Sequence, residues 1–402
     1  MPADIHPFQL HVPDEALVKL KEKLALATYF DEVDFSDDWG YGVPQSDLKR
    51  LVNYWRDGFD WRAQEAKINT LPQYTTTVEI DGFGPFEIHF VYEKSKQPNS
   101  IPLLFSHGWP GSFLEVEKIL KPLTAPKSGP SFHVVAPSLP NFGPSQGASK
   151  PGFGAAQYAE AMHKVMLNLG YDRYVTQGGD WGFKITRTMG FLYPDHCLAS
   201  HLNMVLARRP AFTTAPLQYL MDRLLPKTAG EKLGLQRSKW FNRDGMGYNN
   251  LMSTKPSTIG AALADSPVAL LAWIYEKLHD WTDNYPWTDD EILTWVSIYQ
   301  FSRAGPAANA RIYFEIQSPS RKAPAPNTLD YNPKTKLGLS IFPQDIVMPP
   351  KLWGRTLGPV VFENRHADGG HFAAHERPEL LVADLQAMFK ENGPALSGIR
   401  FS

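Results

Sequence analysis

The sequence predicts an α/β protein whose mostly parallel sheet is interrupted by a helical insertion. Between residues 96 and 202, short apolar segments alternate with amphipathic segments, as expected of a parallel sheet covered by helices on both faces. After a tryptophan-rich helical stretch over residues 203–325, the same rhythm returns over residues 326–402. Active sites of open α/β sheets lie at the carboxyl ends of the strands, so we expect this helical block to cap that edge.

Residues 1–95 form a separate N-terminal part in this division of the chain. A helix is expected directly after Pro13, because the leucines that follow fall on one helical face. Further on, Thr75–Ile80 and Phe86–Tyr92 alternate between apolar and polar residues on either side of Asp81-Gly82. This pattern predicts a β-hairpin.

The two core parts, residues 96–202 and 326–402, each combine strands with helices. Strands are expected at residues 102–106, 133–137, 174–176, 337–342 and 360–363. Helices are expected at residues 113–120, 155–169, 183–193 and 378–389.

Composition and charge exclude several classes of protein. The 402 residues carry a net charge of only -2 and no Lys/Arg cluster, so we expect no nucleic-acid partner. The single cysteine, Cys197, excludes an intramolecular disulfide and a thiolate metal cluster. The first ten residues lack the apolar core of a signal peptide, and no stretch approaches the roughly 18 apolar residues of a membrane span. We expect a soluble cytoplasmic protein and leave a homodimer open.

The run Gly178-Gly179-Asp180-Trp181-Gly182 carries the strongest chemical signal. It lies between the strand at 174–176 and the helix at 183–193, so Asp180 is the centre of a Gly-x-Asp-x-Gly turn. Such a nucleophile elbow projects its central side chain above the sheet. A carboxylate suits this place, because it is ionised at neutral pH and the helix N-terminus stabilises its charge. Taken alone, the run also fits a glycine-rich turn with an aspartate helix cap.

A second pattern offers Ser145 as an alternative nucleophile. Gly143-Pro144-Ser145-Gln146-Gly147 matches the Gly-x-Ser-x-Gly pattern of serine hydrolases. Prolines crowd this segment, however, and no helix starts after Ser145. We therefore favour Asp180.

Oxyanion-hole donors are expected from two loops. His107-Gly108-Trp109-Pro110-Gly111 follows the strand at 102–106. In α/β-hydrolases, the loop after this strand supplies one backbone N–H of the oxyanion hole, and the residue after the nucleophile supplies the other. Pro110 has no N–H, so the expected donors are Trp109 and Trp181.

The expected base is His371, in the loop after the last strand of the core. A base histidine needs a carboxylate that fixes its tautomer and stabilises the imidazolium. Asp345, just beyond the strand at 337–342, fits this role, and the order nucleophile, acid, histidine is that of α/β-hydrolases. Asp368 is a rival acid that lies too close to His371 in the sequence.

Two further histidines accompany His371. His375 would form a two-histidine pair with it at helical spacing, but no third ligand is evident, so we expect no metal. We expect His366 to be a surface residue. Together these observations predict an α/β-hydrolase core with a helical cap insertion.

The chain resembles the microsomal-type epoxide hydrolases, an α/β-hydrolase family, over most of its length. The matching runs are Asp57-Gly58-Phe59-Asp60-Trp61-Arg62 with Glu65, His107-Gly108-Trp109-Pro110-Gly111-Ser112, Gly178-Gly179-Asp180-Trp181-Gly182, Thr254-Lys255-Pro256 with Thr258-Ile259-Gly260, Asp265-Ser266-Pro267, and Gly369-Gly370-His371-Phe372-Ala373-Ala374. Residues 1–95 resemble the family's N-terminal meander. The membrane anchor of some members is not matched, which favours a soluble form.

The resemblance implies hydrolysis of a hydrophobic epoxide to a vicinal diol, without metal or organic cofactor. It implies that two cap tyrosines protonate the epoxide oxygen while Asp180 attacks a ring carbon. One is Tyr248, and the other is Tyr313, with Tyr299 as a nearby alternative. A haloalkane-type dehalogenase with the same aspartate nucleophile is the main alternative, and a catalytically inactive binding protein on the same fold is another.

Overall fold

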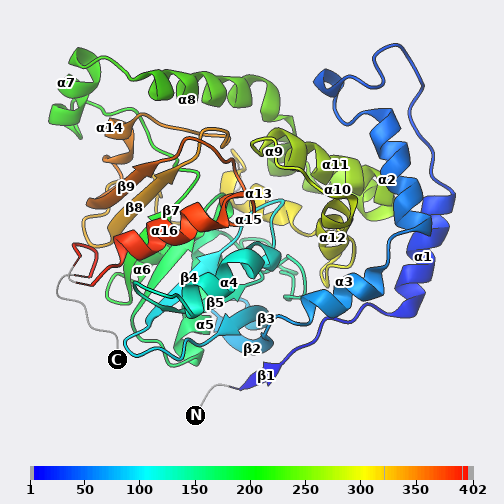
Figure 1. Cartoon of the computed structure of the whole chain (residues 1–402), viewed down its shortest axis with the longest axis horizontal. Helices are drawn as coiled ribbons and strands as arrows, with labels where there is room; N and C mark the ends of the chain where they lie inside the picture. Colours follow the sequence, from blue (N-terminus) through cyan, green and yellow to red (C-terminus); the bar gives the residue numbers. More distant parts are fainter. Residues whose placement is uncertain (1–3, 321, 392, 397–402) are drawn as a thin grey trace.

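The computed structural model describes residues 4–320, 322–391 and 393–396, and its centre is a nine-stranded sheet (Figure 1). The strand order is β1-β2-β3-β5-β4-β6-β7-β8-β9. The strands are β1 (Ile5–Pro7), β2 (Gln73–Ile80), β3 (Gly84–Glu93), β4 (Ile101–Ser106), β5 (Phe132–Pro137), β6 (Tyr174–Gly178), β7 (Cys197–Leu202), β8 (Lys336–Ile341) and β9 (Val360–Arg365). Strands β1, β2, β3 and β5 pair antiparallel, and all pairs from β5 to β9 are parallel. The predicted fold class is confirmed.

Helices cover both faces of the sheet. The core helices are α4 (Glu117–Thr124), α5 (Ala155–Asn168), α6 (Trp181–Leu192), α14 (Lys351–Gly354), α15 (Ala373–Glu376) and α16 (Pro378–Met388). Helices α5 and α6 pack together on one side, and α4 packs with α16 on the other. Every residue of β4 and β6 is buried, as expected of central parallel strands with helices on both faces.

The sequence anticipated most of the core elements. Each predicted strand and the β-hairpin are present, and so are the predicted helices, with small differences at their ends. The helix predicted at 113–120 was only partly right, because the chain first forms the short 3-10 helix η2 (Phe113–Val116) and then α4. Strand β7 was missed because polar residues interrupt its apolar pattern. Those residues are buried and paired: Ser200 bonds Thr176 and His201 bonds Ser340.

A helical block lies between β7 and β8. Its helices are α7 (Pro216–Leu224), α8 (Ala229–Trp240), α9 (Gly247–Thr254), α10 (Pro256–Asp265), α11 (Pro267–Asp280), α12 (Asp289–Gln300) and α13 (Ala310–Gln317), with the short π-helix η3 (Phe241–Gly245) between α8 and α9. Figure 1 shows α9 to α12 gathered beside the N-terminal helices, while α8 extends across the top of the view from α7 toward α9.

The N-terminal helices pack against this block. They are α1 (Asp14–Ala25), α2 (Gln45–Asp57) and α3 (Trp61–Ile68), with a short 3-10 helix, η1 (Trp39–Tyr41), before α2. Helices α1 and α2 contact α11, and α2 also contacts α12. Tyr54 donates a hydrogen bond to Asp290 at 2.8 Å, and Arg50 forms an ion pair with Asp289. Residues far apart in the sequence therefore hold one surface of the helical block in place.

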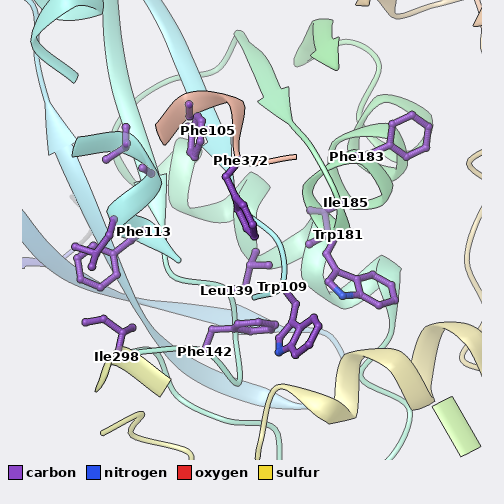
Figure 2. Packing of buried hydrophobic residues seen from close by; sticks show 14 of the residues in the cluster. Phe105, Trp109, Phe113, Leu139, Phe142, Trp181, Phe183, Ile185, Ile298 and Phe372 are labelled. Atoms are coloured by element: carbon purple, nitrogen blue, oxygen red, sulfur yellow. The ribbon is translucent and has the colours of Figure 1, made fainter. Parts of the chain in front are cut away.

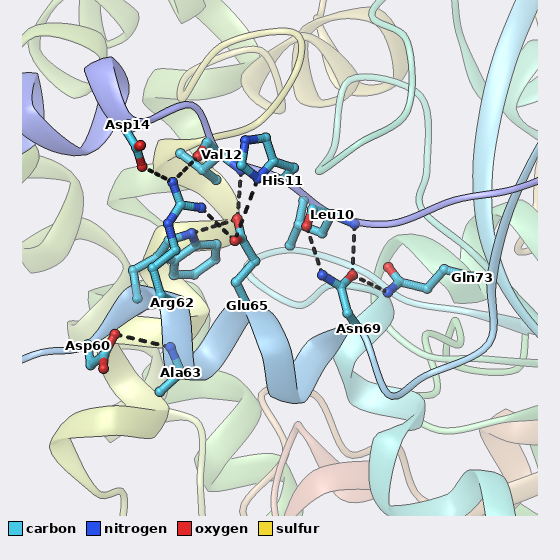
Figure 3. A network of polar contacts seen from close by, with 11 residues as sticks. Leu10, His11, Val12, Asp14, Asp60, Arg62, Ala63, Glu65, Asn69 and Gln73 are labelled. Carbon is cyan, nitrogen blue, oxygen red and sulfur yellow. Dashed lines mark hydrogen bonds and ion pairs between the residues drawn. The ribbon is translucent and has the colours of Figure 1, made fainter.

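A buried carboxylate fastens the N-terminal segment to α3 (Figure 3). Glu65 is 7% exposed and accepts hydrogen bonds from the backbone of Val12 at 2.6 Å and from the indole of Trp61 at 3.1 Å. Arg62 pairs with Glu65 at 2.5 Å and also bonds the carbonyl of Val12 and the carboxylate of Asp14. The N-terminal sequence motif that contains Trp61, Arg62 and Glu65 thus has a structural use.

No single helix within the described residues is long and apolar enough to cross a membrane. The consecutive helices α10 and α11 reach such a length and apolarity only as a pair, and they are bent by 113° at their junction.

Replacing Glu65 by alanine should lower the free energy of unfolding by about 3 kcal/mol, because the change leaves the buried N–H groups of Val12 and Trp61 without an acceptor and removes one of the two carboxylates that pair with Arg62. Urea unfolding followed by circular dichroism measures the effect. Glu15→Ala, at an exposed position in α1, is the matched control and should change stability by less than about 0.5 kcal/mol. Equal stability of Glu65→Ala and the wild type would contradict this account of the N-terminal segment.

Candidate active site

The predicted site residues all follow the carboxyl ends of parallel strands or lie in the helical block. Trp109 follows β4, Asp180 follows β6, Asp345 follows β8 and His371 follows β9. Because these strands are parallel, their carboxyl ends meet at one edge of the sheet. The loops therefore bring together residues that are up to 262 positions apart, from Trp109 to His371.

Asp180 occupies a sharp turn between β6 and α6, in a backbone conformation that few residues other than glycine adopt. Its φ is 52° and its ψ is −122°. The turn also needs glycine on both sides. A Cβ atom at Gly178 would lie 2.5 Å from the carbonyl oxygen of Gly182, and one at Gly182 would lie 2.0 Å from that of Ser106. The strand, turn and helix thus have the geometry of a nucleophile elbow.

The backbone of Trp109 holds one oxygen of the Asp180 carboxylate. Its N–H donates to Asp180 Oδ1 at 2.8 Å. Gly108 allows this approach, since a Cβ atom there would lie 2.3 Å from the same oxygen. Of the two donors expected from the sequence, only Trp109 makes this bond among the described residues. The Trp181 amide is the first of α6, where backbone N–H groups have no partner within the helix.

His371 lies between two carboxylates. Its Nδ1 is 2.7 Å from Asp345 Oδ1, and its Nε2 is 3.6 Å from Asp180 Oδ2. Asp345 is 1% exposed, and its Oδ1 also accepts the backbone N–H of Ile346 at 2.8 Å. The rival acid, Asp368, pairs instead with Arg377. Asp345 is therefore the carboxylate placed to orient the imidazole.

These charges change the protonation of His371. Burial by itself would lower the pKa of the imidazole, but the charges of Asp345 and Asp180 outweigh burial and raise its pKa to about 10. The resting site consequently holds an imidazolium beside Asp180. His371 can act as a base only after its imidazolium has lost a proton, and removal of the charge on Asp180 favours that loss.

Tyr248 and Tyr313 project from α9 and α13 over the tryptophans that flank Asp180. The Tyr248 ring stacks on Trp109 with 4.9 Å between centroids, and the Tyr313 ring meets the Trp181 ring edge-on at 4.6 Å. The centroids of the two tyrosines are 5.8 Å apart. Figure 2 shows Trp109 and Trp181 near one another at the side of the buried cluster.

The hydroxyl groups separate Tyr313 from its alternative, Tyr299. Tyr299 donates its hydroxyl to the carbonyl of Gly111 at 2.5 Å. The hydroxyl of Tyr313 has no hydrogen-bond partner among the described residues, although its side chain is buried. Burial and the charge of Asp180 raise the pKa of both Tyr248 and Tyr313 above the usual range. Both phenols therefore stay protonated and can donate to a ligand.

The remaining sequence candidates are engaged elsewhere. Ser145 is fully buried, donates to the carbonyl of Ser138 at 2.7 Å and accepts the backbone N–H of His89, so it has a structural use. His375 Nε2 lies 3.3 Å from Glu291 in α12 rather than beside His371. No cluster of three metal-binding side chains occurs within the described residues.

The expectation that His366 is a surface residue was wrong. Its side chain is 8% exposed and its Nε2 lies 2.6 Å from Asp384 of α16. Helix α16 packs over His366. The sequence shows only that His366 lies in a loop, and it does not show that a later helix buries that loop.

Two charged residues near the site were missed by sequence reasoning. Lys277 is 3% exposed and its ammonium lies 4.8 Å from the centre of the Tyr248 ring. Glu115 lines the same cavity as Asp180 and His371. Each interrupts an apolar helical segment, Pro267–Asp280 and Phe113–Val116 respectively, and that signal could have singled them out.

Two protein-family models match the chain. The model "Epoxide hydrolase N terminus" matches residues 5–116, and the model "alpha/beta hydrolase fold" matches residues 101–312. A putative epoxide hydrolase of Stigmatella aurantiaca is 38% identical over 96% of this chain and 85% of that protein. Epoxide hydrolase 1 of Sus scrofa is 34% identical over 95% of this chain and 88% of that protein.

Two solved structures that resemble this chain over 96% of its length are also epoxide hydrolases. The epoxide hydrolase of Aspergillus niger superposes with a TM-score of 0.82 at 36% identity and covers 96% of each chain. The juvenile hormone epoxide hydrolase of Bombyx mori gives a TM-score of 0.83 at 28% identity, covering 96% of this chain and 94% of that one.

Asp180→Asn should lower the pKa of His371 from about 10 toward the ordinary 6.5, because the substitution removes a carboxylate charge that favours the imidazolium. An NMR titration of protein labelled with ¹⁵N-histidine measures this pKa. Asp368→Asn is the matched control and should leave it unchanged, since Asp368 pairs with Arg377. A His371 pKa that stays near 10 in Asp180→Asn would show that the Asp180 charge does not act on the imidazole.

Proposed function

The chain belongs to the microsomal-type epoxide hydrolase family and is an epoxide hydrolase, and we propose that it acts through a covalent ester on Asp180. The observation that carries this proposal is that the two carboxylate oxygens of Asp180 have different contacts. Oδ1 is held by the N–H of Trp109, while Oδ2 faces His371 without a direct hydrogen bond and keeps lone pairs for attack. The relatives compared are named epoxide hydrolases, so they lend no support to the dehalogenase alternative.

In the first step, Asp180 Oδ2 attacks one carbon of the epoxide. A C–O bond forms to that carbon, the ring C–O bond breaks, and its electron pair stays on the epoxide oxygen. The epoxide oxygen would leave as an alkoxide, which is a poor leaving group, so ring opening needs a proton donor. Tyr248 and Tyr313 supply it, since they come from two helices that pack against each other and their rings lie over the tryptophans beside Asp180.

Ester formation also prepares the base. The ester removes the negative charge of Asp180, which is one of the charges that raise the pKa of His371. The imidazolium then loses its proton more readily, and this proton replaces the one that the tyrosine gave to the alkoxide. The result is a neutral imidazole beside an uncharged ester, with Asp345 still holding Nδ1.

In the second step, His371 takes a proton from water, whose oxygen attacks the carbonyl carbon of the Asp180 ester. Negative charge develops on Oδ1, where the N–H of Trp109 stabilises it, and we propose the Trp181 amide, at the free N-terminus of α6, as the second donor. The bond between that carbonyl carbon and the substrate oxygen breaks, and the imidazolium returns its proton to that oxygen. A vicinal diol leaves, and Asp180 carries one oxygen atom from water. The second proton of that water passes from the new Asp180 carboxyl to His371, which restores the carboxylate and the imidazolium of the resting site.

The surroundings of the site favour a hydrophobic epoxide. Trp281 is 1% exposed, and its ring centroid lies 5.0 Å from that of His371 and 5.4 Å from that of Tyr248. An aromatic wall of this kind binds apolar substituents. We assign residues 203–325 as the cap that supplies this wall and both tyrosines, and residues 1–95 as a meander that braces the cap.

His371→Gln should trap the ester, because glutamine cannot take a proton from water while Asp180 remains free to attack. Intact-protein mass spectrometry after mixing with styrene oxide should show an adduct one substrate mass heavier. Adding Tyr248→Phe to His371→Gln should slow the appearance of this adduct by about 10- to 100-fold, because one proton donor is lost. Asp180→Asn combined with His371→Gln is the control and should form no adduct. If styrene oxide binds to His371→Gln and no adduct appears, the two-step scheme is wrong.

A further inference from the structure

Lys277 is a charged residue beside the active site that the proposed reaction does not use. It belongs to α11, and its side chain is 4% exposed. Burial of an ammonium group is costly, and an apolar side chain of similar length would fill this position without that cost. A buried charge at such a place is therefore a candidate for a role in the chemistry next to it.

Three aromatic ring centres lie within 6.0 Å of the Lys277 ammonium. The centre of the Tyr248 ring, in α9, is 4.8 Å from Nζ, and those of Trp273 and Trp281 are 5.9 Å and 6.0 Å away. Trp273, Lys277 and Trp281 follow one another at intervals of four residues, so they lie along one face of α11. The electron-rich faces of aromatic rings attract a cation at these distances, and the attraction is larger where water is excluded.

The ammonium has one charged partner among the described residues, and that partner is partly in water. Nζ forms an ion pair with Glu276, the preceding residue of α11. The side chain of Glu276 is 32% exposed, so water screens part of its charge. Lys277 and Tyr248 are both buried, and the charge of the ammonium therefore acts on the Tyr248 ring with less screening.

Tyr248 carries a negative charge at one moment of the proposed reaction. When it donates its proton, the O–H bond breaks, the electron pair stays on the phenol oxygen, and the proton passes to the epoxide oxygen. The phenolate that results is costly, because burial and the charges of Asp180 and Glu276 raise the pKa of Tyr248 above its usual range. A cation beside the ring lowers this cost until the proton of the His371 imidazolium restores the phenol.

Tyr313, the second proton donor, has no comparable neighbour. Its ring contacts Trp109, Trp181 and Tyr248. Among the described residues, no lysine or arginine lies over the Tyr313 ring. Any effect of the Lys277 charge on ring opening should therefore depend on Tyr248.

We propose that Lys277 is a positioning residue for ring opening, whose buried ammonium holds the Tyr248 ring and stabilises the phenolate that forms when Tyr248 protonates the epoxide oxygen. This inference rests on the proposed covalent function. Lys277 acts through Tyr248 and transfers no proton itself. It should therefore speed the formation of the Asp180 ester.

Lys277→Met tests the inference, because methionine has a similar length and no charge. The variants are made in His371→Gln, where the ester accumulates. Each is mixed with saturating styrene oxide, quenched at increasing times, and examined by intact-protein mass spectrometry for the rate of ester formation. We expect Lys277→Met to slow formation by about 5- to 30-fold, and Lys277→Arg, which keeps a cation beside the ring, to stay within about threefold of the His371→Gln parent. Lys232→Met, at an exposed position of α8, is the matched control and should leave the rate unchanged.

Two further variants separate an effect on the phenolate from structural support. In the Tyr248→Phe background no phenolate can form, so adding Lys277→Met should slow ester formation no further. Glu276→Gln removes the ion pair but keeps the ammonium, so it should not slow formation. A residue that only supports the fold of the cap would give the same slowing with either residue at position 248.

Equal rates with and without Lys277→Met would overturn the inference, and so would undiminished slowing in the Tyr248→Phe background. Slowing by Lys277→Arg or Glu276→Gln as large as that by Lys277→Met would also contradict it. If circular dichroism shows that Lys277→Met does not fold, the uncharged Lys277→Gln is measured in the same way, with the same result expected. The covalent scheme fails separately, when His371→Gln forms no ester at all. An ester that forms equally fast without the Lys277 charge refutes only the role of Lys277.

Discussion

The site depends on one backbone constraint, the left-handed conformation of Asp180 between β6 and α6. A non-glycine residue in such a conformation costs on the order of 1–3 kcal/mol, and the surrounding structure has to enforce it. Here Gly178 packs closely against Gly182, and Gly182 packs closely against β4. These contacts hold the backbone of the turn in this conformation. The turn lifts the carboxylate off the sheet and brings Oδ1 to the N–H of Trp109.

Opposing electrostatic effects then set the order of events. Burial disfavours a charged imidazole, yet Asp345 and Asp180 together raise the pKa of His371 to about 10. A base that is protonated in the resting enzyme cannot activate water before Asp180 has reacted. The pairing therefore links activation of the base to ester formation. The same buried surroundings keep Tyr248 and Tyr313 protonated, so nucleophile and acid are ready together.

The sequence was most informative where local pattern and chain order act together. The elbow at Asp180 follows from glycine spacing between a strand and a helix, and Asp345 follows from its place after a parallel strand. The resemblance pointed to Tyr313 and left Tyr299 as an alternative, and sequence could not separate the two further, because the hydroxyl of Tyr299 is engaged by a backbone carbonyl 188 residues away. Glu115 stood out in the sequence only as a charge within an apolar helical segment, and its place at the cavity becomes evident in the folded loop, where Gly111 has no side chain to occupy the same space.

The central claim is that an oxygen atom of Asp180 enters the diol. A single turnover in H₂¹⁸O, with enzyme in excess over styrene oxide, tests it most directly. The account predicts an unlabelled diol and one ¹⁸O atom in the peptide that contains Asp180, measured by mass spectrometry after digestion. An ¹⁸O-labelled diol with no label in that peptide would mean that water opens the epoxide directly, and would contradict the account.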